Sequence, residues 1–146
     1  MDKLQAYGAL VGRIMLASVF IISGWMRIDQ WAPSVAYLSD KGFPVVPVLL
    51  GLTLALQFVA AACVITGYRA RAGAIVLALL TIPATFIFHT YWTYPAGIEQ
   101  QMQGLLFLKN MAILGGLTVV ACLGPGPIVL ELRRPKEQET PHAQPV

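Results

Sequence analysis

Long apolar stretches dominate the chain, and short connections that are polar or contain glycine and proline separate them. A bilayer core about 30 Å thick is crossed by a helix of about 20 apolar residues. Four stretches have that length, and each predicts a membrane-spanning helix: Leu4–Trp25, Val45–Thr66, Ala72–His89 and Leu105–Leu123. We therefore predict an all-α, integral membrane four-helix bundle over residues 1–127.

The connection between the first two spans carries a further helical pattern. Pro33–Ser39 is predicted to form a short helix on the outer surface of the membrane, with Val35 and Leu38 facing the bilayer. Gly42 is predicted to end this helix, because glycine adopts the left-handed conformation of a helix end without strain.

The two sides of the predicted bundle differ in charge. Six lysines and arginines lie on the side of the termini: Lys3, Arg69, Arg71, Arg133, Arg134 and Lys136. The other side has only Arg27 and Lys41, together with all three tryptophans. Cytoplasmic connections are enriched in lysine and arginine, so we predict that both termini lie in the cytoplasm.

Composition also indicates a membrane protein. Hydrophobic residues make up 57% of the 146 residues and charged residues 12%, whereas soluble domains carry about 25% charged residues. Too little polar surface remains to cover a soluble globule, so the lipid bilayer is the expected surrounding. The basic residues lie at the ends of apolar stretches and form no stripe, so nucleic acid is not an expected partner.

Other parts of the chain predict no chemistry. Residues 128–146 are predicted to be a disordered cytoplasmic tail, because the polar, proline-rich segment Glu131–Val146 cannot bury apolar surface. Cys63 and Cys122 lie in separate apolar stretches and are interpreted as small buried residues. No residue pattern in the spans predicts a metal site or a catalytic group. A redox cofactor, if used, would be diffusible or belong to a partner.

The polar residues inside the spans are more informative. Arg13, Gln57 and Lys109 lie within apolar stretches, His89 closes the third, and all seven acidic residues lie outside the spans. An arginine at the bilayer centre costs at least about 2.5 kcal/mol, so Arg13 is expected to face the bundle interior and find an acceptor. Gln57, a serine hydroxyl, a backbone carbonyl, water or a ligand could supply it.

A shared ligand pocket is one hypothesis for these side chains. Arg13 shares its helix face with small residues such as Ala17, which permit close helix packing and leave space beside a long side chain. A pocket lined by Arg13, Gln57, His89 and Lys109, open toward the outer leaflet, would accept a flat ligand. In the alternative, Lys109 extends toward the membrane surface and His89 is a polar residue at the interface.

Several short motifs follow one another along the bundle: Gly12-Arg13, Ser23-Gly24, Gly42-Phe43-Pro44, Phe88-His89-Thr90-Tyr91-Trp92, Phe107-Leu108-Lys109-Asn110, Gly115-Gly116 and Gly124-Pro125-Gly126. Together they resemble the DoxX family of small bacterial membrane proteins. The resemblance implies a four-helix protein of the bacterial inner membrane linked to redox metabolism. It also adds Trp92 and Asn110 to the candidate ligand-binding residues. Relatives are described as the small subunit of a thiosulfate:quinone oxidoreductase and as membrane anchors of oxidative-stress complexes.

Two positions depart from that family's pattern. Gln57 stands where the family often has glutamate, and Arg27 stands where it often has lysine. The glutamine removes the expected ion-pair partner of Arg13 or Lys109, and with it a proton carrier.

Two functions fit these features. The first is a membrane subunit that binds a quinone, or another electron-rich small ligand, through buried arginine and lysine. These cations would stabilise negative charge on a quinone oxygen. The second is a non-catalytic anchor or assembly partner of a soluble redox enzyme or another membrane subunit. A permease is less favoured, because the sequence has no evident internal repeat.

Overall fold

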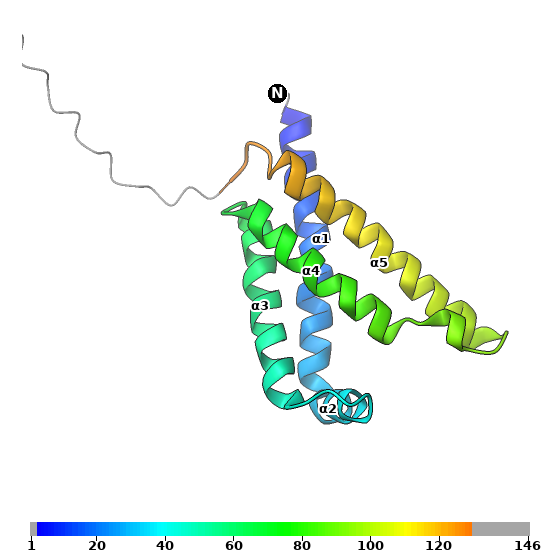
Figure 1. Ribbon diagram of the computed structural model, residues 1–146. Coiled ribbons are helices and arrows are strands. Elements are labelled where there is room, and N and C mark those ends of the chain that lie inside the picture. The colour runs from blue at the N-terminus through cyan, green and yellow to red at the C-terminus, as the bar shows by residue number, and fades with distance from the viewer. Residues whose placement is uncertain (1–2, 130–146) are drawn as a thin grey trace, which may run out of the picture.

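A computed structural model describes residues 3–129, so most of the predicted tail lies outside the described residues. The elements in chain order are α1 (Lys3–Asp29), α2 (Trp31–Asp40), α3 (Val46–Thr66), α4 (Ala70–Phe88), the short 3-10 turn η1 (Tyr91–Thr93) and α5 (Ile98–Leu123) (Figure 1). Four of the helices are long and apolar enough to cross a membrane, namely α1, α3, α4 and α5. The described residues form no strand, and the predicted four-span, all-α architecture is confirmed.

The helices extend beyond the apolar stretches that predicted them. α1 continues to Asp29 instead of ending at Trp25, and α5 begins at Ile98 instead of Leu105. The added residues 98–104 of α5 are rich in glutamine and glutamate, which are good helix formers, and Gly97 precedes them. Backbone hydrogen bonding therefore continues past the apolar spans. Hydropathy alone ends α1 too early and begins α5 too late.

α2 joins α1 to α3 at the end of the bundle away from the start of α1 and the end of α5 (Figure 1). We call this the α2 end and the opposite one the terminal end. The predicted short helix is present, and the following Gly42 has a φ of +83°. Val35 and Leu38 are half-buried, whereas most of α2 is exposed. The two residues predicted to face the bilayer thus lie on the less exposed part of this helix.

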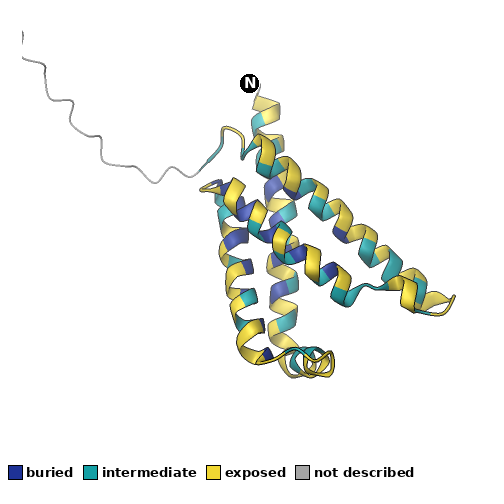
Figure 2. Ribbon diagram, viewed as in Figure 1, coloured by how far each residue is buried: buried dark blue, intermediate teal, exposed yellow. Residues whose placement is uncertain are grey.

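The packed core lies toward the terminal end. α4 packs against both α3 and α5, and α1 packs against α3, whereas α1 and α5 touch at few places. The core is built largely from small and branched apolar residues: Ala17, Phe20, Ala60, Ala61, Val64, Ala74, Leu77 and Leu117. Figure 2 shows buried positions on the sides where the helices face one another. Small side chains let the helix backbones approach closely, as is usual in membrane bundles.

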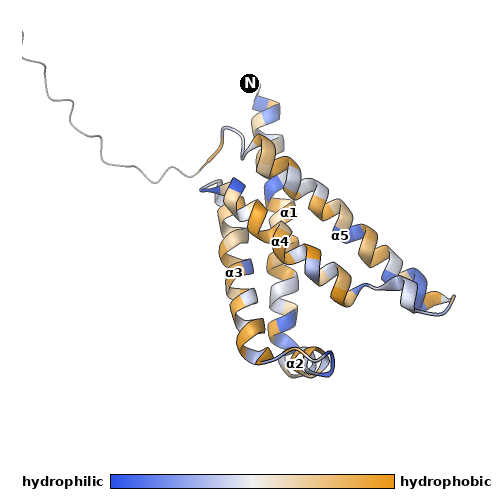
Figure 3. Ribbon diagram, in the orientation of Figure 1, coloured by the Kyte–Doolittle hydropathy of each residue, from blue (hydrophilic) through white to orange (hydrophobic). Residues whose placement is uncertain are grey.

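The helices separate toward the α2 end, where α4 and α5 lean away from α1 and α3 (Figure 1). Their outward faces are apolar, with large exposed side chains such as Leu52, Leu79 and Leu105. Hydrophilic residues gather at the helix ends, and isolated hydrophilic turns interrupt α1, α3 and α5 (Figure 3). An apolar exterior of this extent suits lipid rather than water.

Candidate functional site

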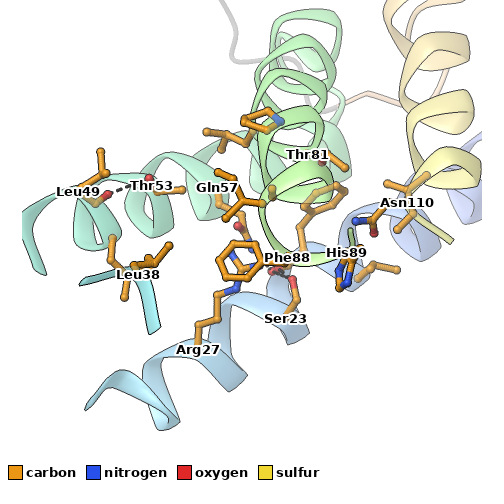
Figure 4. A pocket seen from close by; sticks show the side chains of 18 of the residues that line it. Ser23, Arg27, Leu38, Leu49, Thr53, Gln57, Thr81, Phe88, His89 and Asn110 are labelled. Carbon is orange, nitrogen blue, oxygen red and sulfur yellow. Dashed lines mark hydrogen bonds between the residues drawn. The ribbon is translucent and has the colours of Figure 1, made fainter. Parts of the chain in front are cut away.

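A cavity of about 290 Å³ lies between the separating helices. All five α-helices contribute to its lining. Four of the six predicted ligand-binding residues line it: Gln57, His89, Lys109 and Asn110. The other two, Arg13 and Trp92, do not. Figure 4 shows how side chains from different helices surround this space.

Arg13 lies outside the cavity, so the hypothesis that it shares a pocket with Gln57, His89 and Lys109 is wrong. Arg13 is only 2% exposed, and its guanidinium donates hydrogen bonds to backbone carbonyls. Nε bonds the carbonyl of Ala9 at 3.4 Å, Nη1 bonds that of Val64 at 3.4 Å, and Nη2 bonds that of Ile128. Of the acceptors considered from sequence, backbone carbonyls are the ones used. Ile128 and Val129, which begin the predicted tail, are described and lie against the bundle.

Trp92 belongs to an aromatic cluster beside the cavity. Its ring centroid lies 5.2 Å from that of Tyr91 and 6.0 Å from that of Phe107, both in edge-on arrangements. Phe86 completes the group. These contacts pack η1 against α4 and α5, which gives Trp92 a structural role. The motif resemblance alone does not tell this role from ligand binding.

Arg27 takes the place in the cavity that Arg13 was expected to fill. Because α1 continues to Asp29, the residues Phe20, Ser23 and Arg27 lie on one helix face, and all three line the cavity. The Arg27 guanidinium carbon lies 5.3 Å from the ring centroid of Phe88, a cation–π distance. The sequence offered a signal for Arg27, since its position follows the Ser-Gly motif, but ending the helix at Trp25 placed it in a connection.

Gln57 is held in the cavity wall by α1. Its Nε2 donates to the carbonyl of Phe20 at 2.7 Å and to the hydroxyl of Ser23 at 3.3 Å. Gln57 is 5% exposed. An ionised glutamate in this position has no hydrogen to donate to the Phe20 carbonyl. The neutral glutamine amide has such a hydrogen and makes the bond.

Asn110 is held in the opposite wall by α4. Its Nδ2 donates to the Thr85 hydroxyl at 2.9 Å, and that hydroxyl donates to the carbonyl of Thr81 at 2.7 Å. Thr85 is fully buried and Asn110 is 9% exposed. This hydrogen-bonded chain fixes the Asn110 side chain, because the Thr85 hydroxyl accepts from its nitrogen and donates to the Thr81 carbonyl.

His89 and Lys109 lie at the edge of the cavity. His89 Nδ1 lies 3.0 Å from Oε1 of Gln103, which joins the end of α4 to α5. Lys109 is exposed, so the expectation of a buried lysine is wrong. It lines the cavity nonetheless.

A second hollow of about 330 Å³ adjoins the cavity and lies against α2. The two spaces share five residues: Arg27, Leu38, Leu50, Phe88 and His89. The Phe88 ring stacks on Tyr37 of α2 with centroids 5.3 Å apart. These shared side chains form the boundary between the cavity and the hollow.

The chemistry of the cavity is that of an apolar space with a few fixed polar groups. Its lining includes two cations and one histidine but no acidic residue. Such a space suits a ligand with a ring or chain that fills the apolar part and oxygen atoms that meet the polar groups.

A bundle of four apolar spans around a polar-edged cavity defines a multi-pass integral membrane protein. The DoxX family matches residues 8–90, which is more than half of the chain. The chain belongs to the DoxX family, as the motifs predicted.

Relatives support an inner-membrane location. Inner membrane protein YqjF of Escherichia coli (strain K12) is 32% identical over 126 residues, covering 86% of this chain and 91% of that protein. Inner membrane protein YphA of the same organism is 27% identical over 124 residues, covering 85% and 88%. The surfeit locus protein 4 homolog of Drosophila melanogaster is 23% identical over 138 residues, covering 92% of this chain and 44% of that protein. No solved structure matches the chain.

Proposed function

We propose that this DoxX-family protein is a membrane subunit linked to redox metabolism, and that its cavity binds the head group of a quinone or a similar electron-rich ring. One observation carries the proposal. Five charged, amide or imidazole side chains from different parts of the fold line one apolar-walled cavity: Arg27, Gln57, His89, Lys109 and Asn110. No acidic residue in the described range lines it.

The size and position of the cavity support a ring-shaped ligand. Its volume of about 290 Å³ is near the lower end of the range for ligand pockets, about 300–1,000 Å³. A single ring fits such a space, and a long apolar tail would leave between α1 and α5 into lipid. Lys109 and Arg27 would stabilise negative charge that develops on a ring oxygen, and His89 would exchange a proton with it.

We also propose that both termini lie in the cytoplasm, which places the cavity in the outer half of the membrane. The excess of lysine and arginine at the terminal end supports this orientation. Reporter fusions after residue 146 and in the α2 connection test it. Activity of a cytoplasm-specific reporter in the α2 connection would contradict the proposed orientation.

Binding of a short-chain benzoquinone to the purified full-length protein in nanodiscs tests the ligand proposal. Lys109→Met and Arg27→Met should each weaken binding by about fivefold or more, because each removes a cation of the cavity lining that would donate to a ring oxygen. Lys41→Met is the matched control, since Lys41 lies over Tyr37 at the α2 end and does not line the cavity. Equal loss in Lys41→Met, or no binding by the wild type, would contradict this site.

A second candidate function is a non-catalytic anchor or assembly partner of a soluble redox enzyme. The observation that favours it is that Arg13, the most buried cation of residues 3–129, donates to backbone carbonyls and so organises the bundle. Deletion of residues 131–146 should then abolish co-purification of a partner, while benzoquinone binding to the wild type is absent.

A further inference from the structure

The Gln57 carboxamide presents its oxygen to the cavity. A carbonyl oxygen can only accept a hydrogen bond, so the group facing the Phe20 carbonyl at 2.7 Å must be the amide nitrogen. Oε1 therefore points elsewhere, and no donor to it is found among residues 3–129. No side-chain nitrogen or oxygen in that range is both fully buried and unpartnered. Because Gln57 is almost fully buried and lines the cavity, its oxygen is open to that space.

Asn110 is oriented in the same sense by a different set of contacts. The Thr85 hydroxyl uses its one hydrogen to donate to the Thr81 carbonyl at 2.7 Å. It can therefore only accept from Asn110, which assigns the nitrogen to the Thr85 side at 2.9 Å. The described residues supply no donor to Oδ1 of Asn110. Because no unpartnered side-chain oxygen in residues 3–129 is fully buried and Asn110 lines the cavity, Oδ1 is open to that space.

His89 contributes a third acceptor. The Gln103 side-chain oxygen, 3.0 Å from Nδ1, can only accept, so neutral His89 carries its hydrogen on Nδ1. Nε2 is then left with a lone pair. His89 lines both the cavity and the adjacent hollow, whereas Gln103 lines only the hollow. Gln103 is thus a positioning residue that determines which ring nitrogen accepts.

We propose that the cavity selects ligands that donate hydrogen bonds, and that it binds a hydroquinone in preference to the corresponding quinone. This inference rests on the proposed function. A hydroquinone has hydroxyl hydrogens for the acceptors on Gln57, Asn110 and His89. A quinone has only carbonyl oxygens, which would face those acceptors without a hydrogen between them. Lys109 and Arg27 donate to the oxygens of either form, so they do not discriminate.

The expected preference is large enough to measure. A site whose buried groups pair with a hydroxyl rejects an analogue that lacks it, because the site's polar groups are then left unpaired. With three acceptors, we expect the hydroquinone to bind at least about tenfold more tightly than the quinone. For a two-electron pair, a tenfold preference raises the midpoint potential of the bound ligand by about 30 mV.

Equilibrium binding under anaerobic conditions tests the inference with the full-length protein in nanodiscs. The probes are a decyl-substituted 1,4-benzoquinone, its hydroquinone and the dimethyl ether of that hydroquinone, which keeps the ring but has no donor. The hydroquinone should bind at least about tenfold more tightly than either of the others. Equal affinity for quinone and hydroquinone overturns this inference and leaves the proposed function standing. Absence of binding by all three probes overturns both.

A variant outside the cavity tests the hydrogen-bond assignment separately. Gln103→Leu releases the His89 ring without changing a residue that lines the cavity, so the preference for hydroquinone should fall about threefold or more. Gln101→Leu is the control, because Gln101 is an exposed glutamine on the same helix. An unchanged preference in Gln103→Leu, or an equal fall in Gln101→Leu, overturns the role assigned to His89 and Gln103.

Discussion

The guanidinium of Arg13 donates a hydrogen bond to the carbonyl oxygen of Ile128, 115 positions later in the chain. The segment after α5 thus returns across the terminal end of the bundle. There, a Cβ on Gly126 would meet Ala9 at 3.0 Å, and a Cβ on Gly67 would meet Val129 at 2.7 Å. Arg13 therefore connects α1, the end of α3 and the segment that follows α5.

Replacing Arg13 should destabilise the protein without altering the cavity. Arg13→Met leaves the carbonyls of Val64 and Ile128 without this donor, and hydrogen bonds to charged groups contribute about 1.5–3 kcal/mol each. Because the bonds are coupled, we expect the free energy of unfolding to fall by about 2–4 kcal/mol. Denaturation in mixed micelles measures the loss. The affinity of the folded fraction for benzoquinone should stay unchanged, and a fall in that affinity would argue against the separation of Arg13 from the cavity.

Gly67 should tolerate no side chain. Its φ is +81°, and a Cβ there would lie 2.5 Å from Nη1 of Arg13. Gly42 has a similar φ of +83° with nothing within 4 Å of a Cβ. Gly42→Ala therefore measures the backbone strain alone, about 1–2 kcal/mol. Gly67→Ala should lower the free energy of unfolding by about 1 kcal/mol or more beyond the loss in Gly42→Ala, on the order of a lost buried contact. Equal losses in the two variants would show that the contact with Arg13 does not contribute to stability.

The close approach of α3 and α4 depends on Gly73. A Cβ at this position would lie 2.7 Å from the backbone oxygen of Ala60 and 3.0 Å from Cβ of Cys63. Backbone atoms cannot move aside, so Gly73→Ala should separate the helices and cost about 1–3 kcal/mol. Gly115→Ala, with nothing within 4 Å, should be neutral or slightly stabilising because alanine favours the helix. Thermal unfolding in detergent compares the two, and similar midpoints would refute the contact.

The Thr85 hydroxyl should matter beyond its own helix. Thr85→Val removes the acceptor for Asn110 and leaves a buried amide hydrogen unpaired, at a cost of about 1–3 kcal/mol. Thr118→Val removes the same type of own-helix bond, to Leu114, at an exposed site, and should change stability by less than about 0.5 kcal/mol. Unfolding free energies of the two variants give the comparison. A Thr85→Val protein as stable as Thr118→Val would contradict the bond to Asn110.

The candidate site was predictable in part. Gln57, His89 and Lys109 stand out in the sequence because they are polar residues in or at the end of apolar spans, and they do line one cavity. Arg13 stands out for the same reason, but it bonds carbonyls at the terminal end. Arg27 was missed because hydropathy ends α1 at Trp25, while the helix continues and carries Arg27 onto the cavity face.

The sequence by itself determined the membrane architecture, because the length of an apolar stretch set against the thickness of a bilayer is a local property. It also determined the short helix before Gly42, whose glycine is a local signal for a helix end. The tertiary structure alone decided that Arg13 bonds Ile128, and that Asn110 meets Thr85. Those pairings depend on the tilt and relative height of helices far apart in the chain, which are set by packing between side chains and not by the order of residues along one helix.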